Sequence, residues 1–297
     1  MAAAIKRKPI YVLILPRFED IFHSFYTGEI TKGVNLAASR LNVDFLVHIT
    51  DRGDHTTWLD ATLLDRKHVD GILFADIDND LDIVKRAITR GMPCLVLNNI
   101  IHEPINYIAV NNHKAAAQVV EEFIKLGHTQ IATIAGDLTT QAGQARLDGY
   151  HDALAKHNIK ENKEYVKIGG FLRTPARAAA QDLLKLKKPP TAIFAASDVM
   201  ALEVIDVAKA KKMRIPGDIA LCGFDDNPLR EQSSVKLATV AQPLVEMGRL
   251  GLEMLYQISH GKAKLPVKEV LPAKLIKAES MGLPFSTAGT VIKSARV

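Results

Sequence analysis

Four polar residues follow two apolar runs in the second half of the chain, and their side chains could bind a polar ligand. They form two pairs, Ser197-Asp198 and Asp225-Asp226. Hydroxyl and carboxylate oxygens can exchange hydrogen bonds with a hydroxyl-rich ligand. Asp198 also has a second interpretation, because aspartate is a preferred N-cap residue and a helix is predicted to begin here. The pattern therefore predicts a binding site near these residues and a capping role for Asp198.

Motifs for catalysis or metal binding are missing from the sequence. It contains no G-x-G-x-x-G, G-x-x-x-x-G-K-[ST], G-x-S-x-G, H-E-x-x-H or paired C-x-x-C. The ten histidines are dispersed, and His48, His55 and His68 lack the spacing of metal ligands. We therefore expect a binding protein rather than an enzyme, with no cofactor and no metal.

A strand, a helix and a second strand must position the two polar pairs. Residues 191–195 form a short apolar run after two prolines, and helical periodicity continues from there until Pro216-Gly217. The next run, 219–223, is almost wholly apolar, which is typical of a strand buried on both faces of a parallel sheet. Open α/β sheets bind ligands beyond the carboxyl ends of their strands. Ser197, Asp198 and Asp225 lie at those positions.

The same alternation of strand and helix runs through most of the chain and predicts two α/β halves that join near Val110-Asn111. The predicted strands span residues 11–15, 43–49, 71–74, 94–98, 107–110, 131–135 and 165–168, before the two strands already described. The predicted helices span residues 28–41, 56–67, 81–90, 114–126, 144–157 and 175–187. The end of the chain departs from this pattern. It has a strand-like run at 237–240, a long helix at 243–260 and a last strand pair or extended segment at 269–277.

Composition indicates a soluble globular protein. The chain has 297 residues, of which 47% are hydrophobic and 24% charged, with a net charge of +5. Basic residues are scattered through the predicted helices and lie beside acidic stretches, so no basic nucleic-acid-binding face is expected within this chain. Two isolated cysteines form neither a disulfide framework nor a metal site. No membrane span or export signal is recognisable, so a cytoplasmic location is expected.

Seven short runs together resemble the effector-binding core of the LacI/GalR family of bacterial transcription regulators. The runs are EEFIKLGH (121–128), RLDGY with AL (146–150 and 153–154), PTAIFAASD (190–198), IPGD (215–218), GFDD (223–226), LATVAQP (237–243) and ES (279–280). Their order and spacing carry the resemblance, which covers about residues 9–282. It implies a periplasmic binding protein-like fold of type I.

In that fold, two Rossmann-like subdomains with parallel sheets are joined by three crossovers, and a sugar or another small effector binds in the cleft between them. The crossovers would fall near Val110, Ala241 and Pro272. The implied subdomains are residues 9–110 with 243–271 and residues 111–242 with 272–284, followed by a tail at 285–297.

The resemblance also implies effector-binding residues. Arg146 and Asp225 match the arginine and the first aspartate that contact the effector in such proteins; their alternatives are a surface arginine and a strand-end cap. Further matches are Ser197, Asn98, Phe171 and the pair Phe25 and Tyr26, for which ordinary packing is the alternative. Ser197 stands where sugar-binding members often carry asparagine, so a hydroxyl or a water would replace an amide contact.

The chain departs from the family at its start. Family members begin with a helix-turn-helix headpiece and a hinge helix, whereas here residues 1–8 lead directly into the first predicted strand. Either the headpiece was removed or the protein never had one. The tail has no leucine heptads, so we expect a homodimer rather than a tetramer.

We therefore predict a sugar-sensing core of a LacI/GalR-type regulator that acts on operator DNA only through a headpiece missing from this chain. Whether the effector is an inducer or a corepressor stays open. The first alternative is the sugar-binding protein of an ABC transporter, which has the same fold. The second is an enzyme of α/β fold, for which the sequence offers no nucleophile or acid–base pair.

Overall fold

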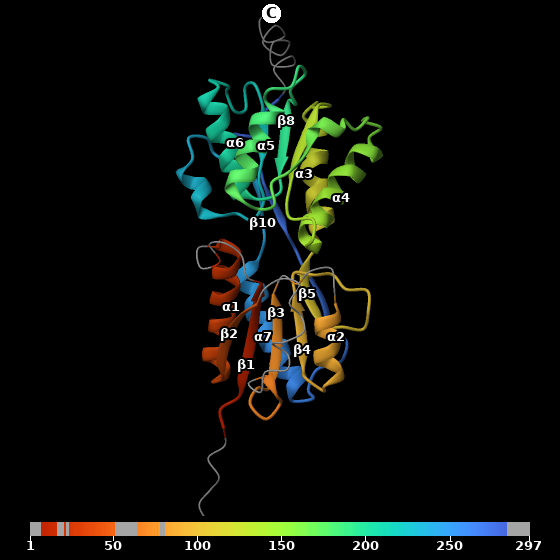
Figure 1. Cartoon of the computed structure of the whole chain (residues 1–297), viewed down its shortest axis with the longest axis vertical. Helices are drawn as coiled ribbons and strands as arrows, with labels where there is room; N and C mark the ends of the chain where they lie inside the picture. Colours follow the sequence, from red (N-terminus) through yellow and green to blue (C-terminus); the bar gives the residue numbers. More distant parts are fainter. Residues whose placement is uncertain are drawn as a thin grey trace, which may run out of the picture. The chain divides into compact units, whose positions relative to one another are not determined.

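The chain forms two compact units. The computed structural model describes residues 7–16, 21, 24–50, 64–75, 77 and 81–283 (Figure 1). Unit 1 comprises Met1–Val110 and Pro243–Pro272, and unit 2 comprises Asn111–Gln242 and Ala273–Val297. Most of the predicted helix at 56–67 and the whole tail at 285–297 lie outside the described residues.

Unit 1 contains a six-stranded parallel sheet. Its strands follow the order β11-β5-β4-β3-β1-β2, and each neighbouring pair is parallel. The strands are β1 (Ile10–Pro16), β2 (Asp44–Thr50), β3 (Gly71–Ala75), β4 (Cys94–Leu97), β5 (Tyr107–Val110) and β11 (Lys268–Leu271). Strands β3, β4 and β5 are buried along their whole length, which explains their continuous apolar sequences.

Three described helices cover this sheet. They are α1 (Phe25–Leu41), α2 (Asp82–Thr89) and α7 (Leu244–Ser259). A Cβ on Gly251 of α7 would lie 2.8 Å from Leu97 and 3.3 Å from Leu73, so α7 packs directly on β4 and β3. Helix α2 packs in a separate cluster with Ile72 and Phe74, which alternate with Leu73 along β3 and therefore face the other way.

Unit 2 has a second parallel sheet, in the order β7-β6-β8-β9. Its strands are β6 (Ile131–Ala135), β7 (Val166–Ile168), β8 (Ala192–Ala195) and β9 (Ala220–Cys222). Helices α3 (Asn112–Lys125) and α4 (Gln141–Lys156) pack on one face, and α5 (Arg173–Leu183) and α6 (Asp198–Ala210) pack on the other (Figure 1). The predicted α/β class with parallel sheets is confirmed.

The last predicted segment, a strand pair or an extended segment, does not form a strand pair. Residues 269–277 do form two strands, β11 and β12 (Lys274–Ile276), but these strands do not pair with each other. Strand β11 joins β5 in unit 1. Strand β12 pairs antiparallel with β10 (Thr239–Ala241) in unit 2. The chain crosses from unit 1 to unit 2 between the two strands, after Pro272.

Candidate functional site

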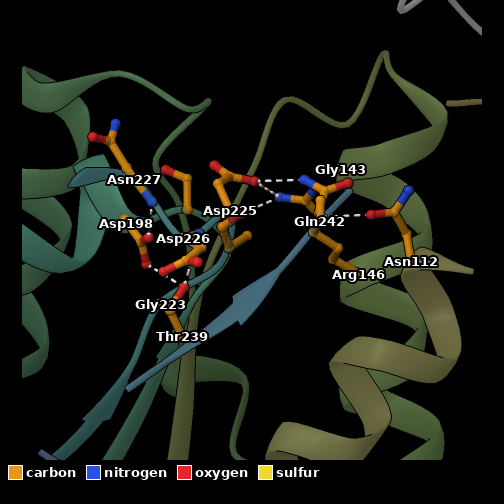
Figure 2. Close-up of polar contacts among 12 residues, drawn as sticks. Asn112, Gly143, Arg146, Asp198, Gly223, Asp225, Asp226, Asn227, Thr239 and Gln242 are labelled. Atoms are coloured by element: carbon orange, nitrogen blue, oxygen red, sulfur yellow. Dashed lines mark hydrogen bonds and ion pairs between the residues drawn. The ribbon is translucent and has the colours of Figure 1, made fainter. Parts of the chain in front are cut away.

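The polar residues predicted at the strand ends of unit 2 gather at the carboxyl edge of its sheet. Figure 2 shows Arg146, Asp225 and Gln242 directed toward one another, with Asp198 and Thr239 next to them. The strand order β7-β6-β8-β9 changes direction between β6 and β8, and α/β sheets of this kind bind ligands near such a switch point.

Arg146 is the centre of this cluster. It lies on α4, and only 3% of its surface is exposed. Its Nε donates to Asn112 Oδ1 at 2.9 Å and its Nη1 donates to the Ala196 carbonyl oxygen at 2.6 Å. The guanidinium also lies 3.7 Å from the centroid of the Phe224 ring, a cation–π contact that is strengthened by burial. The alternative of a surface arginine is therefore wrong.

Asp225 faces Arg146 from the loop that follows β9. Its Oδ1 accepts from Arg146 Nη1 at 3.3 Å and from Gln242 Nε2 at 2.8 Å. About a fifth of its side chain is exposed. Its φ of 111° is rare for a residue with a side chain, and strained backbone of this kind clusters at functional sites. The N–H of Asp225 donates to the Val240 carbonyl oxygen at 2.8 Å, which holds the strained residue beside β10.

Phe171 lies near Arg146 as well. Its ring centroid is 5.6 Å from Arg146 Cζ. A Cβ on Gly136, just after β6, would overlap the Phe171 ring, so the glycine leaves the space that the aromatic ring fills. Phe171 has a φ of 63°, again an unusual conformation for a non-glycine residue. The structure thus brings the predicted aromatic residue to the predicted arginine.

The predicted N-cap at Asp198 is wrong by one residue. Ser197 caps α6, and its Oγ accepts from the Met200 N–H at 3.3 Å. Asp198 is the first residue of the helix, and its Oδ2 instead accepts from the Asn227 N–H at 2.7 Å. Its Oδ1 accepts from Thr239 Oγ1, also at 2.7 Å. The effector contact expected of Ser197 stays a prediction.

Burial and the nearby Asp225 carboxylate raise the pKa of Asp198 to about 8. Hydrogen bonds from Thr239 and Asn227 and the charge of Arg230 act in the opposite direction. The desolvation of a charged carboxylate dominates, because Asp198 has no exposed surface.

The other predicted site residues, Asn98, Phe25 and Tyr26, belong to unit 1. Asn98 follows β4, has a φ of 64° and is 3% exposed. Within the described parts of the chain, its Oδ1 has no hydrogen-bond partner. Phe25 and Tyr26 form the first turn of α1, which is capped by Ser24. Their roles toward an effector stay predictions.

Three residues that contact Arg146 or Asp225 were not predicted as site residues. Asn112 starts α3, Phe224 follows β9, and Gln242 ends the segment after β10. Phe224 and Gln242 both lie inside motifs that carried the family resemblance, which was the available signal. Asn112 had no such signal, since only the fold shows that it binds Arg146, 34 positions away.

Other kinds of site find no support among the described residues. No group of three or more histidine, cysteine, aspartate or glutamate side chains in the described ranges could hold a metal ion. Nor does that part of the chain contain a helix both long and apolar enough to span a membrane.

Comparison with known proteins places the chain in a family. Residues 120–281 match the periplasmic binding protein-like domain family. The chain is 31% identical over 259 residues to the HTH-type transcriptional regulator CelR of Thermobifida fusca, a match that spans 86% of this chain and 76% of CelR. The chain belongs to the LacI/GalR family of periplasmic binding protein-like regulators. A second LacI/GalR-type relative, the HTH-type transcriptional repressor CytR of Escherichia coli K12, is 32% identical over 84% of this chain and 73% of CytR.

The fold agrees with this family assignment. A solved structure of the CelR–cellobiose complex superimposes with a TM-score of 0.84 and 29% identity, covering 93% of this chain and 85% of CelR. The named relatives of this LacI/GalR chain are transcriptional regulators rather than enzymes.

Proposed function

We propose that this chain is the sensing core of a transcriptional regulator and binds an uncharged sugar at the Arg146–Asp225–Gln242 cluster. The observation that carries the proposal is the convergence of Arg146 and Gln242 on one oxygen of a partly exposed carboxylate. Such a fixed set of polar groups beside aromatic rings suits the hydroxyl groups and the apolar faces of a sugar.

The cluster offers both donors and acceptors to hydroxyl groups. Gln242 Nε2 is oriented by Asp225, which places the amide oxygen on the other side of the group. Gln242 Oε1 is buried and accepts no hydrogen bond from any described residue. A ligand hydroxyl that donated to this oxygen would satisfy it, and leaving such an acceptor unsatisfied is unfavourable.

Charge pairing favours an uncharged ligand over a uronate or a sugar phosphate. Arg146 is paired with Asp225. Arg230, the next arginine at this edge of the sheet, is paired with Asp226 at 2.7 Å. An anionic ligand would have to compete with these carboxylates for the guanidinium groups, whereas a neutral sugar only adds hydrogen bonds to them.

The relatives support a sugar as the ligand and transcriptional regulation as the function. The solved CelR structure is a complex with cellobiose, and we extend a sugar ligand to this chain by similarity. CelR and CytR are HTH-type regulators, which favours regulation over sugar transport. The effector would then change operator binding by a headpiece joined to this core, in a cytoplasmic homodimer.

The test is a calorimetric screen of neutral mono- and disaccharides, with uronates and sugar phosphates as the charged comparison. Asp225→Asn should weaken binding of the selected sugar about 10- to 100-fold because it removes the charge of the acceptor. Arg146→Lys should have an effect of about the same size, because an ammonium group cannot replace the fixed directions of the guanidinium donors. Asp218→Asn is the matched control, since Asp218 pairs with Arg214 at an exposed position.

The proposal fails if both site variants bind the selected sugar as tightly as the wild type does. Selection of uronates over neutral sugars would reject the neutral ligand class, while loss of binding in Asp218→Asn as well would point to general destabilisation.

A further inference from the structure

The loop that carries Asp225 is held at its base by two buried side chains, Asp198 and Thr239. Asp198 Oδ2 accepts from the Asn227 N–H, and its Oδ1 contacts Thr239 Oγ1. Thr239 Oγ1 in turn accepts from the Asp226 N–H at 3.3 Å. The Asp198 N–H donates to the Phe224 carbonyl oxygen at 2.7 Å. Backbone groups on both sides of Asp225 are thus tied to the start of α6 and to β10 (Figure 2).

This loop needs such restraint because its backbone is strained. Asp225 has a φ of 111° and Asp226 a φ of 60°. Two consecutive non-glycine residues in this region persist only where the surrounding structure fixes them. We call Asp198, Thr239 and the N–H groups of Asp226 and Asn227 the latch.

The Asp198 carboxyl fits closely into its place. A Cβ on Gly223 would overlap Asp198 Oδ1, so a residue with a side chain at position 223 would displace the carboxyl. Asp198 and Thr239 have no exposed surface. The carboxyl group therefore cannot reach water without opening the loop.

Several charged groups face Asp198. Asp225 and Asp226 lie in the loop, and Arg230 lies in the short helix η5 (Pro228–Gln232) and binds Asp226. Cys222 comes from β9, and burial, followed by the charge of Asp198, raises the pKa of its thiol. On α4, Arg146 binds the Ala196 carbonyl oxygen.

Helix α5 adds two more cations nearby. Its Arg173 and Arg177 bind Glu203, which is further along α6 than Asp198.

Both protonation states of Asp198 can form the latch, but they differ in free energy. The 2.7 Å between Asp198 Oδ1 and Thr239 Oγ1 suits a proton on either oxygen. A charged carboxylate here would be buried and close to Asp225, and this raises the pKa of Asp198 to about 8. If opening of the loop brings the group to water, its pKa falls toward the usual value, so a proton stabilises the closed latch.

We propose that Asp198 is a positioning residue for Asp225. Protonated Asp198 holds the loop Gly223–Asn227 closed, and ionisation of Asp198 allows the loop to open. The link from this latch to effector binding rests on the proposed function, because Asp225 is the proposed ligand contact. A ligand hydroxyl donating to Asp225 would reduce the repulsion between the two carboxylates and favour release of the proton.

Amide hydrogen exchange of the whole chain tests the latch without any ligand. The reporters are the N–H groups of Asp226 and Asn227, which bond directly to Thr239 and Asp198. Between about pH 6.5 and about pH 9, their protection factors should fall at least about tenfold and then level off, since the open state gains up to tenfold per pH unit only until pH passes the pKa of Asp198 in the closed loop. The Ala220 N–H, bonded to the Thr191 carbonyl oxygen at the other end of the sheet, is the reference and should not change.

Variants separate positioning from general stability. Asp198→Asn should be at least as well protected as the wild type at about pH 6.5 and should lose the pH dependence, because its amide can donate to Thr239 as the protonated acid does and cannot ionise. Thr239→Val should lower the protection of both reporters about tenfold through the loss of hydrogen bonds, and Thr239→Ser should restore it.

The latch is rejected if the wild-type reporters keep their protection up to about pH 9, or if Asp198→Asn loses protection with pH as the wild type does. If Asp198→Asn does not fold, unchanged protection in Thr239→Val rejects it as well. A sugar screen without any binder would reject the proposed function alone and would leave these exchange results valid.

Discussion

At the scale of single residues, Asp198 makes the free energy of unfolding depend on pH. Burial and Asp225 raise its pKa to about 8, whereas in the unfolded chain an aspartate has a pKa of about 3.9. Between about pH 4 and pH 8, the folded chain therefore holds a proton that the unfolded chain releases. The contribution of Asp198 to the free energy of unfolding is fully present below this window and decreases as pH rises through it.

Replacement of Asp198 by asparagine should remove this contribution. The free energy of unfolding of the wild type relative to Asp198→Asn should fall with rising pH, by up to about 1.4 kcal/mol per pH unit. Urea unfolding followed by circular dichroism at intervals between about pH 5 and pH 8 measures this difference. A difference that stays constant or grows with pH would contradict the assignment.

The contributions of the other titrating groups to the free energy of unfolding largely cancel when the wild type and Asp198→Asn are compared at each pH. His128, whose pKa is lowered by burial, would by itself make the protein more stable as pH rises. It is present in both proteins, so the comparison isolates position 198.

The sequence predicts some single residues of the site better than others. Arg146 and Asp225 could be found because each lies in a recognisable run. The partners of Asp198 could not, since Thr239 lies 41 positions away and only the pairing of strands brings it near. The one-residue shift of the cap from Asp198 to Ser197 has a similar cause, because both residues are good caps and the choice depends on where the buried loop needs a carboxylate.

At the scale of elements, unit 1 depends on the contact between α1 and α7. A Cβ on Gly33 would overlap the Val245 carbonyl oxygen, and one on Gly248 would overlap the Ile30 carbonyl oxygen. The backbones of the two helices therefore touch at these two glycines, one on each helix. Arg40 of α1 adds an ion pair with Glu253 of α7 at 2.6 Å.

Gly33→Ala should destabilise the protein although alanine is the better helix former. Overpacking should cost about 1–3 kcal/mol, more than the gain in helix propensity of about 1 kcal/mol. Gly28→Ala is the matched control on the same helix, because a Cβ there meets nothing within 4 Å. It should leave stability unchanged or raise it by up to about 1 kcal/mol. Thermal unfolding of both variants measures this, and equal effects would contradict the close contact.

The sequence predicts elements well where periodicity is local and poorly where pairing is distant. The strand at 131–135 matches β6 at both ends. The helix predicted at 175–187 ends earlier, at Leu183. The prediction is too long because residues that favour helices continue past Leu183 and the next proline is Pro189. The pairing of β11 and β12 with strands of different units could not be predicted, since the sequence of a short extended run does not determine which strand it pairs with.

At the scale of the whole molecule, the exposed apolar residues of unit 1 predict a surface that a second copy would cover. Leu36 on α1 is 50% exposed, and Leu46 and Val47 on β2 are 46% and 44% exposed. Strand β2 lies at the edge of the described sheet. Exposed apolar side chains along an edge strand favour association with another chain, and dimers are typical of this family.

We therefore expect the chain to sediment as a homodimer and Leu46→Glu or Leu36→Glu to shift it toward the monomer. Each change removes buried apolar area and adds a charge, which should weaken the dimer at least about tenfold. Ile88→Glu is the matched control, because Ile88 is an exposed apolar residue on α2 of the same unit. Sedimentation equilibrium over a range of concentrations measures the dissociation constants, with circular dichroism to show that each variant is folded. A dimer weakened by Ile88→Glu but not by the other two changes would place the interface on the α2 face. A monomeric wild type would favour the alternative function, a sugar-binding protein of an ABC transporter.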